Sequence, residues 1–121
     1  MGKFSKMIAS LAVAGAVFAA NSAEAAAPAT FARCAVCHNA EKGAAAKVGP
    51  NLYGIYGKKA ASQKFAYSEA LKKSGLVWND AGLDKWIAGP MQAVPGTYMA
   101  FPGIKDAAKR AELIAYLKSL K

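Results

Sequence analysis

Residues 34–38 read Cys34-Ala35-Val36-Cys37-His38, a C-x-x-C-H motif. A polypeptide with this spacing takes up haem through two thioether bonds and a histidine ligand. Residues three apart on a helical turn share a face, so both sulfurs can reach the vinyl groups along one porphyrin edge while the adjoining imidazole turns under the iron. The motif therefore predicts one haem c, attached covalently through Cys34 and Cys37 and ligated by His38.

Other uses of a Cys-x-x-Cys pair fit this chain less well. A closed zinc site needs about four Cys or His ligands, whereas the chain holds two Cys and one His in total. A thioredoxin-like dithiol would lie near a βαβ pattern, which the sequence does not show. A disulfide or dithiol site stays the alternative for the two cysteines, and a hydrogen-bonded core histidine is the alternative for His38.

The first 25 residues have the three regions of a secretory signal peptide. A basic n-region with Lys3 and Lys6 and an apolar h-region over 7–20 precede a small-x-small cleavage site, Ala23-Glu24-Ala25. We expect residues 1–25 to be removed by cleavage near Ala25 and the protein to be periplasmic. An uncleaved membrane anchor is the rival interpretation, although the apolar run is shorter than the ~20 residues that span a bilayer.

The remaining residues, 26–121, are expected to form one strongly basic domain. Loss of Lys3, Lys6 and Glu24 lowers the formal net charge from +9 to +8. Basic charge alone can indicate a nucleic-acid or anionic-membrane partner. However, an exported protein has no obvious nucleic-acid partner, and the lysines form no K/R-rich block. A domain this small buries little surface, and a covalently held haem would supply the apolar centre it needs.

Apolar residues recur at helical spacing and no convincing strand is present, so the sequence predicts an all-α fold. We expect a small single domain of helices and Gly/Pro-rich loops wrapped around the haem. Helix ends are marked by Pro28 at the N1 position of the first helix, Ser68 and Gly75 around the second, Asn79 or Asp80 and Gly89-Pro90 around the third, and Asp106 before the last. The last helix has one apolar stripe, which is most simply core: Leu113, Tyr116, Leu117 and Leu120.

The sixth ligand of the haem iron would be a methionine thioether, a lysine amine or absent, because the chain has no second histidine. Two methionines follow the signal peptide, Met91 and Met99, both in the loop expected between the two C-terminal helices. Methionine is more often a core filler than a ligand. A loop rich in Pro and Gly can nevertheless hold an extended path over the haem face opposite His38.

The chain after residue 25 resembles the class I cytochrome c family, in the soluble single-haem branch with mitochondrial cytochrome c and bacterial cytochromes c2. The resemblance covers nearly all of residues 26–121. It rests on five motifs in this order: residues 34–38, Gly49-Pro50-Asn51-Leu52, Tyr67 with Trp78 eleven residues later, Pro95-Gly96-Thr97-Tyr98-Met99, and Leu113-Ile114-Ala115-Tyr116-Leu117. The first motif alone occurs in many haem proteins, but the five together are highly specific.

The resemblance implies roles for several residues around the haem. Met99 would be the distal ligand, so the iron would be held by His38 and Met99. The carbonyl of Pro50 would accept the other N–H of the proximal histidine and fix its tautomer. Tyr67 and Trp78 would hydrogen-bond a haem propionate, although both also suit the edge of a core.

Other matched positions concern the pocket lining. Thr97 would line the distal pocket. Lys58 replaces a propionate-pairing arginine, and a lysine can neutralise charge but cannot offer a planar two-pronged donor. Trp86 stands where mitochondrial relatives have a tyrosine near the ligand sulfur, and Leu71 stands where they have an asparagine. The short first helix leaves open how fully it packs on the final one.

With both axial positions taken, the iron has no open position for a substrate, so the expected function is electron transfer by Fe(III)/Fe(II) cycling rather than enzymatic catalysis. A gas-binding or sensing haem protein, or a weak peroxidase with a labile distal methionine, is the alternative. A haem subunit of a larger oxidoreductase is the third possibility.

The expected partners are acidic-surfaced redox proteins or respiratory or photosynthetic membrane complexes, bound transiently by a monomer that does not span the membrane once mature. Acidic partners would be favoured electrostatically, chiefly through the association rate. The docking surface would centre on an apolar patch around Tyr98. Nine lysines would surround it: Lys42, Lys47, Lys58, Lys59, Lys64, Lys72, Lys73, Lys85 and Lys105.

Overall fold

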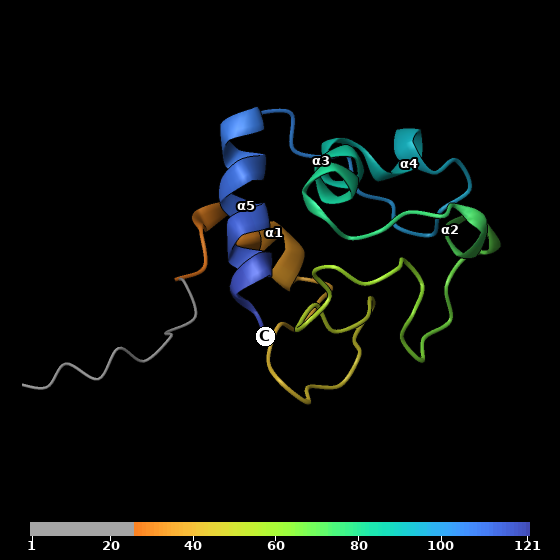
Figure 1. The fold of residues 1–121 in the computed structure, drawn as a ribbon, viewed down its shortest axis with the longest axis horizontal. Helices are drawn as coiled ribbons and strands as arrows, with labels where there is room; N and C mark the ends of the chain where they lie inside the picture. The colour runs from red at the N-terminus through yellow and green to blue at the C-terminus, as the bar shows by residue number, and fades with distance from the viewer. Residues whose placement is uncertain (1–25) are drawn as a thin grey trace, which may run out of the picture.

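The computed structural model describes residues 26–121, and the predicted signal peptide lies outside them. Short helices and long loops make up this part of the chain (Figure 1): η1 (Ala29–Phe31), α1 (Ala32–Ala35), α2 (Glu69–Lys73), α3 (Asp80–Ala88), α4 (Pro90–Ala93) and α5 (Ala107–Ser119). Strand pairing within residues 26–121 is limited to one isolated antiparallel bridge between Lys59 and Val77. The all-α prediction is therefore confirmed. Over the same range no helix combines the length and the apolar content needed to cross a bilayer.

Side-chain caps begin the three longest helices. Ser68, Asn79 and Asp106 each accept a hydrogen bond from a backbone N–H of the first turn, at 3.1, 2.8 and 2.9 Å respectively. Each bond satisfies a donor that has no partner within its own helix. The predicted caps are confirmed, and Asn79 rather than Asp80 is the capping residue of α3.

The glycines and prolines that were expected at helix ends agree with the structure less well than the caps do. Gly75 follows α2 with a φ of +69°, a left-handed conformation that suits a residue without Cβ. Pro28 is not at the N1 position: its ψ of 156° is extended, and its carbonyl accepts the Phe31 N–H at 2.9 Å, so the first turn begins one residue later. Part of the expected C-terminal loop is helical, because Pro90 opens α4, and Met91 lies in that helix.

Helix α5 organises the core. The N-terminal turn η1 and helix α3 both pack on it, and α4 packs on α3 (Figure 1). Leu113 and Leu117 are buried along α5, and Leu120 is buried directly after its end. Tyr116 is half-buried, with its ring 4.8 Å from that of Phe31 in an edge-to-face contact. The apolar stripe is thus core, and the short N-terminal segment does pack on the final helix.

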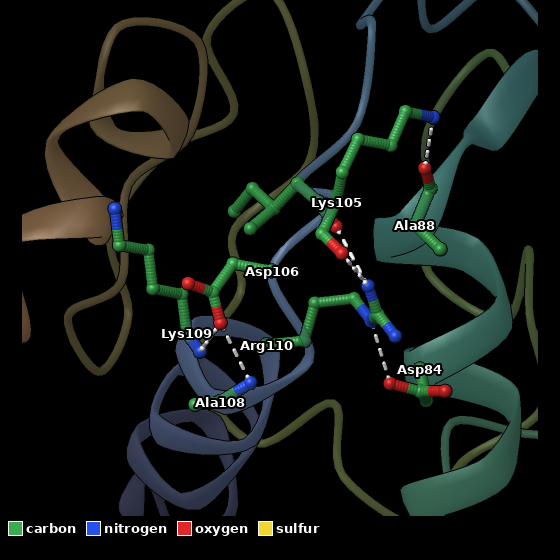
Figure 2. Close-up of polar contacts among 8 residues, drawn as sticks. Asp84, Ala88, Lys105, Asp106, Ala108, Lys109 and Arg110 are labelled. Carbon is green, nitrogen blue, oxygen red and sulfur yellow. Dashed lines mark hydrogen bonds and ion pairs between the residues drawn. The ribbon is translucent and has the colours of Figure 1, made fainter.

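A cluster of polar contacts joins the segment after Met99 to α3 and α5 (Figure 2). The Arg110 side chain on α5 donates to the carbonyls of Ile104 and Lys105 at 3.0 and 2.9 Å, and to a carboxylate oxygen of Asp84 on α3 at 2.7 Å. Lys105 in turn donates its Nζ–H to the carbonyl of Ala88 at 2.6 Å. These bonds fix the C-terminal end of the segment that carries Met99.

Candidate functional site

A cavity of about 370 Å³ lies between the N-terminal helical segment, α3, α5 and the loops. Its volume falls within the range of about 300–1,000 Å³ that is usual for small-molecule and cofactor sites. Eight of the nine predicted site residues border it: Cys34, Cys37, His38, Pro50, Tyr67, Trp78, Thr97 and Met99. The ninth, Lys58, is exposed and does not border the cavity.

One helical turn carries the two cysteines and the histidine. The N–H groups of Cys37 and His38 both donate to the Cys34 carbonyl, at 3.1 and 2.9 Å, so the helical turn continues beyond the end of α1. Both cysteines are half-buried free thiols. Burial raises the pKa of Cys34, and the neighbouring Arg33 charge opposes that rise. This turn presents two sulfurs and one imidazole to the same cavity wall.

The imidazole of His38 is oriented by a backbone carbonyl. Nδ1 lies 2.7 Å from the carbonyl oxygen of Pro50, and in the tautomer that makes this bond Nδ1 carries the proton. Burial lowers the pKa of His38, the Pro50 bond opposes that change, and the Lys47 charge adds to it. The ring is therefore neutral near pH 7, and its Nε2 keeps a lone pair that can ligate a metal.

The chain that returns beneath this ring leaves no space for a side chain. A Cβ built at Gly49 would overlap the His38 ring, with Nδ1 at 2.7 Å and Nε2 at 2.8 Å. The Gly49 N–H donates to the Cys37 carbonyl at 2.9 Å, and Lys47 donates its Nζ–H to the Ala35 carbonyl at 3.0 Å. The loop is thus tied to the cysteine turn on both sides of Val48.

Met99 lies in a tightly turned segment at the cavity. Its N–H donates to the Thr97 hydroxyl at 3.3 Å, and its carbonyl accepts the Phe101 N–H at 3.0 Å. Met99 is half-buried and borders the cavity, whereas Met91 is 42% exposed and does not. Among the described residues, Met99 is therefore the methionine placed to donate a thioether to a group in the cavity.

Aromatic and polar side chains line another part of the cavity. The Tyr67 hydroxyl accepts the backbone N–H of Gln63 at 3.3 Å, and burial raises the pKa of Tyr67. The Gln63 amide donates to the Asn51 carbonyl at 2.7 Å. Trp78 packs on Trp86, with ring centroids 5.4 Å apart. Tyr67 thus keeps its own O–H available as a donor.

Several lining residues were not singled out as site residues from the sequence. Trp86 and Leu71, noted only as departures from related pockets, are buried in the lining, as is Leu83. Arg33 and Phe101 also border the cavity. Arg33 directly precedes the first cysteine, which is a usable local signal, but Phe101 lies far along the chain and no sequence pattern pairs it with Arg33.

The residues around the cavity fit a covalently attached haem. Close-packed interiors hold few voids larger than a water molecule, so a cavity of this size in so small a domain suits a group that fills it. Its lining is mainly apolar, with a cysteine pair and a histidine on one turn and a thioether on a separate segment. Thioether formation at the two cysteines and axial donation by nitrogen and sulfur would use this donor set.

Comparisons with known proteins agree with this fit. The family model for cytochrome c matches residues 22–121. Cytochrome c of Theileria parva is 51% identical over 86 residues, covering 71% of this chain and 75% of that protein. Cytochrome c2 of Rhodoblastus acidophilus is 45% identical over 92 residues, covering 75% and 86%. The solved structure of cytochrome cH from Methylobacterium extorquens has a TM-score of 0.68 and 52% identity, covering 74% of this chain and 90% of that one.

Proposed function

This chain belongs to the cytochrome c family, and we propose that it is an exported carrier of single electrons whose haem is ligated by His38 and Met99. Its cofactor is haem c, attached covalently through Cys34 and Cys37, and its function is haem-based electron transfer. The bound haem supplies a one-electron Fe(III)/Fe(II) cycle. The proposal itself concerns three further points: ligation of the iron by His38 and Met99, export to the periplasm, and the surface that docks redox partners.

The observation that carries the ligand assignment is the placement of two donors from distant segments around one cavity. His38 is held by its Nδ1 bond to Pro50, which leaves Nε2 as the donor and strengthens it. Met99 is held by the turn at 97–101. A thioether donor and an apolar environment both favour the ferrous state and therefore raise the reduction potential. Donors at both axial positions leave none for a substrate, which favours a carrier over an enzyme.

The polar residues at the cavity are proposed to hold the haem propionates. Because the Tyr67 hydroxyl already accepts the Gln63 N–H, its own hydrogen can be donated to a carboxylate. A phenol is protonated at neutral pH, and burial raises the pKa of Tyr67 further. We assign the indole N–H of Trp78 to the same task. Lys58 would act as a neutralising charge from outside the lining, and Thr97 would position Met99 through its hydroxyl.

The surface around the mouth of the cavity is proposed to dock redox partners. Val48 and Tyr98 both border the cavity and are 77% and 75% exposed. Three lysines of the predicted basic surface are already engaged: Lys47 with the Ala35 carbonyl, Lys72 with Glu69, and Lys105 with the Ala88 carbonyl. The other six have no side-chain ion pair or hydrogen bond within residues 26–121: Lys42, Lys58, Lys59, Lys64, Lys73 and Lys85. We expect an acidic partner to dock transiently on this surface, and the protein to act as a monomer.

Export is proposed from the order of the basic, apolar and small-residue regions in residues 1–25. The mature protein would begin at Ala26, form a single domain over 26–121 and act in the periplasm. The mass of the intact protein, purified from its periplasmic fraction, should equal that of residues 26–121 plus one haem. A mass that retained Met1 to Ala25 would refute cleavage.

Two methionine variants test the distal ligand. In the oxidised, haem-loaded protein, Met99→Ala should abolish the long-wavelength band of thioether-to-iron ligation. In the reduced protein, the same substitution should allow carbon monoxide to bind. Met91→Leu is the matched control, because Met91 does not border the cavity, and it should leave both properties unchanged. Retention of the band in Met99→Ala, or its loss in Met91→Leu, would overturn the assignment.

A further inference from the structure

Arg33 and Phe101 are in contact in the lining of the cavity. Arg33 lies on α1, directly before Cys34, and Phe101 lies two residues after Met99. The guanidinium carbon of Arg33 is 4.8 Å from the centroid of the Phe101 ring, within the range of a cation–π interaction. Both side chains border the cavity. The contact therefore connects the segment that attaches the haem to the segment that carries Met99.

This contact is the main polar interaction of Arg33 in the described part of the chain. Within residues 26–121 its guanidinium makes no ion pair or side-chain hydrogen bond, whereas Arg110 donates to two carbonyls and one carboxylate. Phe101 is coupled to Met99 directly, because the Phe101 N–H donates to the Met99 carbonyl at 3.0 Å. A contact that holds the Phe101 side chain in place therefore restrains a residue whose backbone is bonded to that of Met99.

We propose that Arg33 is a positioning residue for Met99: its cation–π contact with Phe101 holds residues 99–101 against α1 and slows the opening of the distal side. This rests on the proposed ligation by Met99. A lysine at position 33 would keep the charge but not the planar face that stacks on a ring. The planar guanidinium of Arg33, and not its charge alone, is therefore what the contact with Phe101 requires.

The test measures how fast imidazole replaces the distal thioether in the oxidised, haem-loaded protein. At saturating neutral imidazole, the rate of loss of the thioether band reports the opening of the Met99 segment. Loss of an exposed cation–π contact should raise this rate about two- to fivefold in Arg33→Gln and in Phe101→Leu. Arg33→Lys should also be faster than the wild type. Lys109→Gln, which removes a charge from an exposed position on α5, is the control and should match the wild type.

The double variant Arg33→Gln/Phe101→Leu decides whether the two residues act as a pair. It should open no faster than the faster single variant, and the same pairing should appear as non-additive free energies of unfolding. Multiplicative effects on the rate, or a wild-type rate in Arg33→Gln, would overturn the proposal. If the wild-type protein itself lacks the thioether band, the ligand assignment fails, and the proposal about Arg33 fails with it.

Discussion

Single residues determine how the imidazole of His38, the proposed proximal ligand, is oriented. Gly49 passes directly beneath the His38 ring, and the Pro50 carbonyl that follows accepts the Nδ1–H. A glycine is required here by close approach and not by its φ, which lies outside the left-handed region. The missing Cβ at position 49 and the acceptor at position 50 therefore act together to set the orientation of the His38 ring.

Gly49→Ala should destabilise the haem-loaded protein by about 1–3 kcal/mol, because the added Cβ must displace the imidazole or the loop. Denaturant unfolding gives the free energy, and NMR of the His38 ring reports its displacement. Gly43→Ala is the comparison: its φ of +76° imposes backbone strain, but nothing lies within 4 Å of the added Cβ. A disturbed His38 signal in Gly43→Ala, or an undisturbed one in Gly49→Ala, would contradict this role.

The candidate site could be predicted from sequence where its residues belong to local motifs. Cys34, Cys37 and His38 are contiguous, and Met99 is recognisable through the Pro-Gly-Thr-x-Met run before it. The pairing of Arg33 with Phe101 depends on how two distant segments pack, which no local pattern encodes. Lys58 matched a family position, yet its exposed side chain does not border the cavity. Its proposed role stays a prediction.

Helices in this chain were predictable mainly from their caps. Ser68, Asn79 and Asp106 satisfy backbone donors with their own side chains, so each helix start is determined within one turn of sequence. The start of the first helical turn differs by one residue from the prediction, because the proline residue type fixes φ but does not reveal that ψ of Pro28 is extended. Helix α4 was missed because a single turn has too little periodicity to be distinguished from a loop.

Asp106→Ala should lower the free energy of unfolding by about 0.5–2 kcal/mol. Asp106 accepts hydrogen bonds from the N–H groups of Ala108 and Lys109 at 2.9 and 3.2 Å, and α5 is the helix on which η1 and α3 pack. Glu112→Ala removes an equal charge from an exposed position on α5 and should change stability by less than about 0.5 kcal/mol. Equal effects of the two substitutions would show that charge, not capping, is the cause.

At the scale of the whole molecule, net positive charge and an exposed apolar surface at the cavity mouth combine. The chain has a formal net charge of +9, and Val48 and Tyr98 are exposed where the cavity opens. A basic protein attracts anions from a distance, and salt screens this attraction over about 10 Å at 0.1 M ionic strength. We therefore expect the charge to raise the rate of association with an anionic reactant, and the exposed apolar side chains to contact a docked partner.

Ionic strength should change the electron-transfer rate with a sign set by the reactant's charge. With an anionic oxidant such as hexacyanoferrate(III), the second-order rate for the reduced protein should fall as salt is added. With a cationic cobalt(III) phenanthroline complex, the rate should rise over the same range, because screening removes repulsion. Stopped-flow measurements at several salt concentrations provide both slopes. Slopes of the same sign would mean that the protein's charge does not steer its reactants.

If His38 and Met99 occupy both axial positions of the haem, as proposed, the protein transfers electrons and binds no substrate at the iron. The most direct measurement is the optical spectrum of the haem-matured protein, oxidised and then reduced, with carbon monoxide added to the reduced form. Ligation by both residues should give sharp low-spin bands, a long-wavelength thioether band in the oxidised state and no response to carbon monoxide at neutral pH. Rapid carbon monoxide binding would contradict it and would favour a gas-binding or peroxidase function.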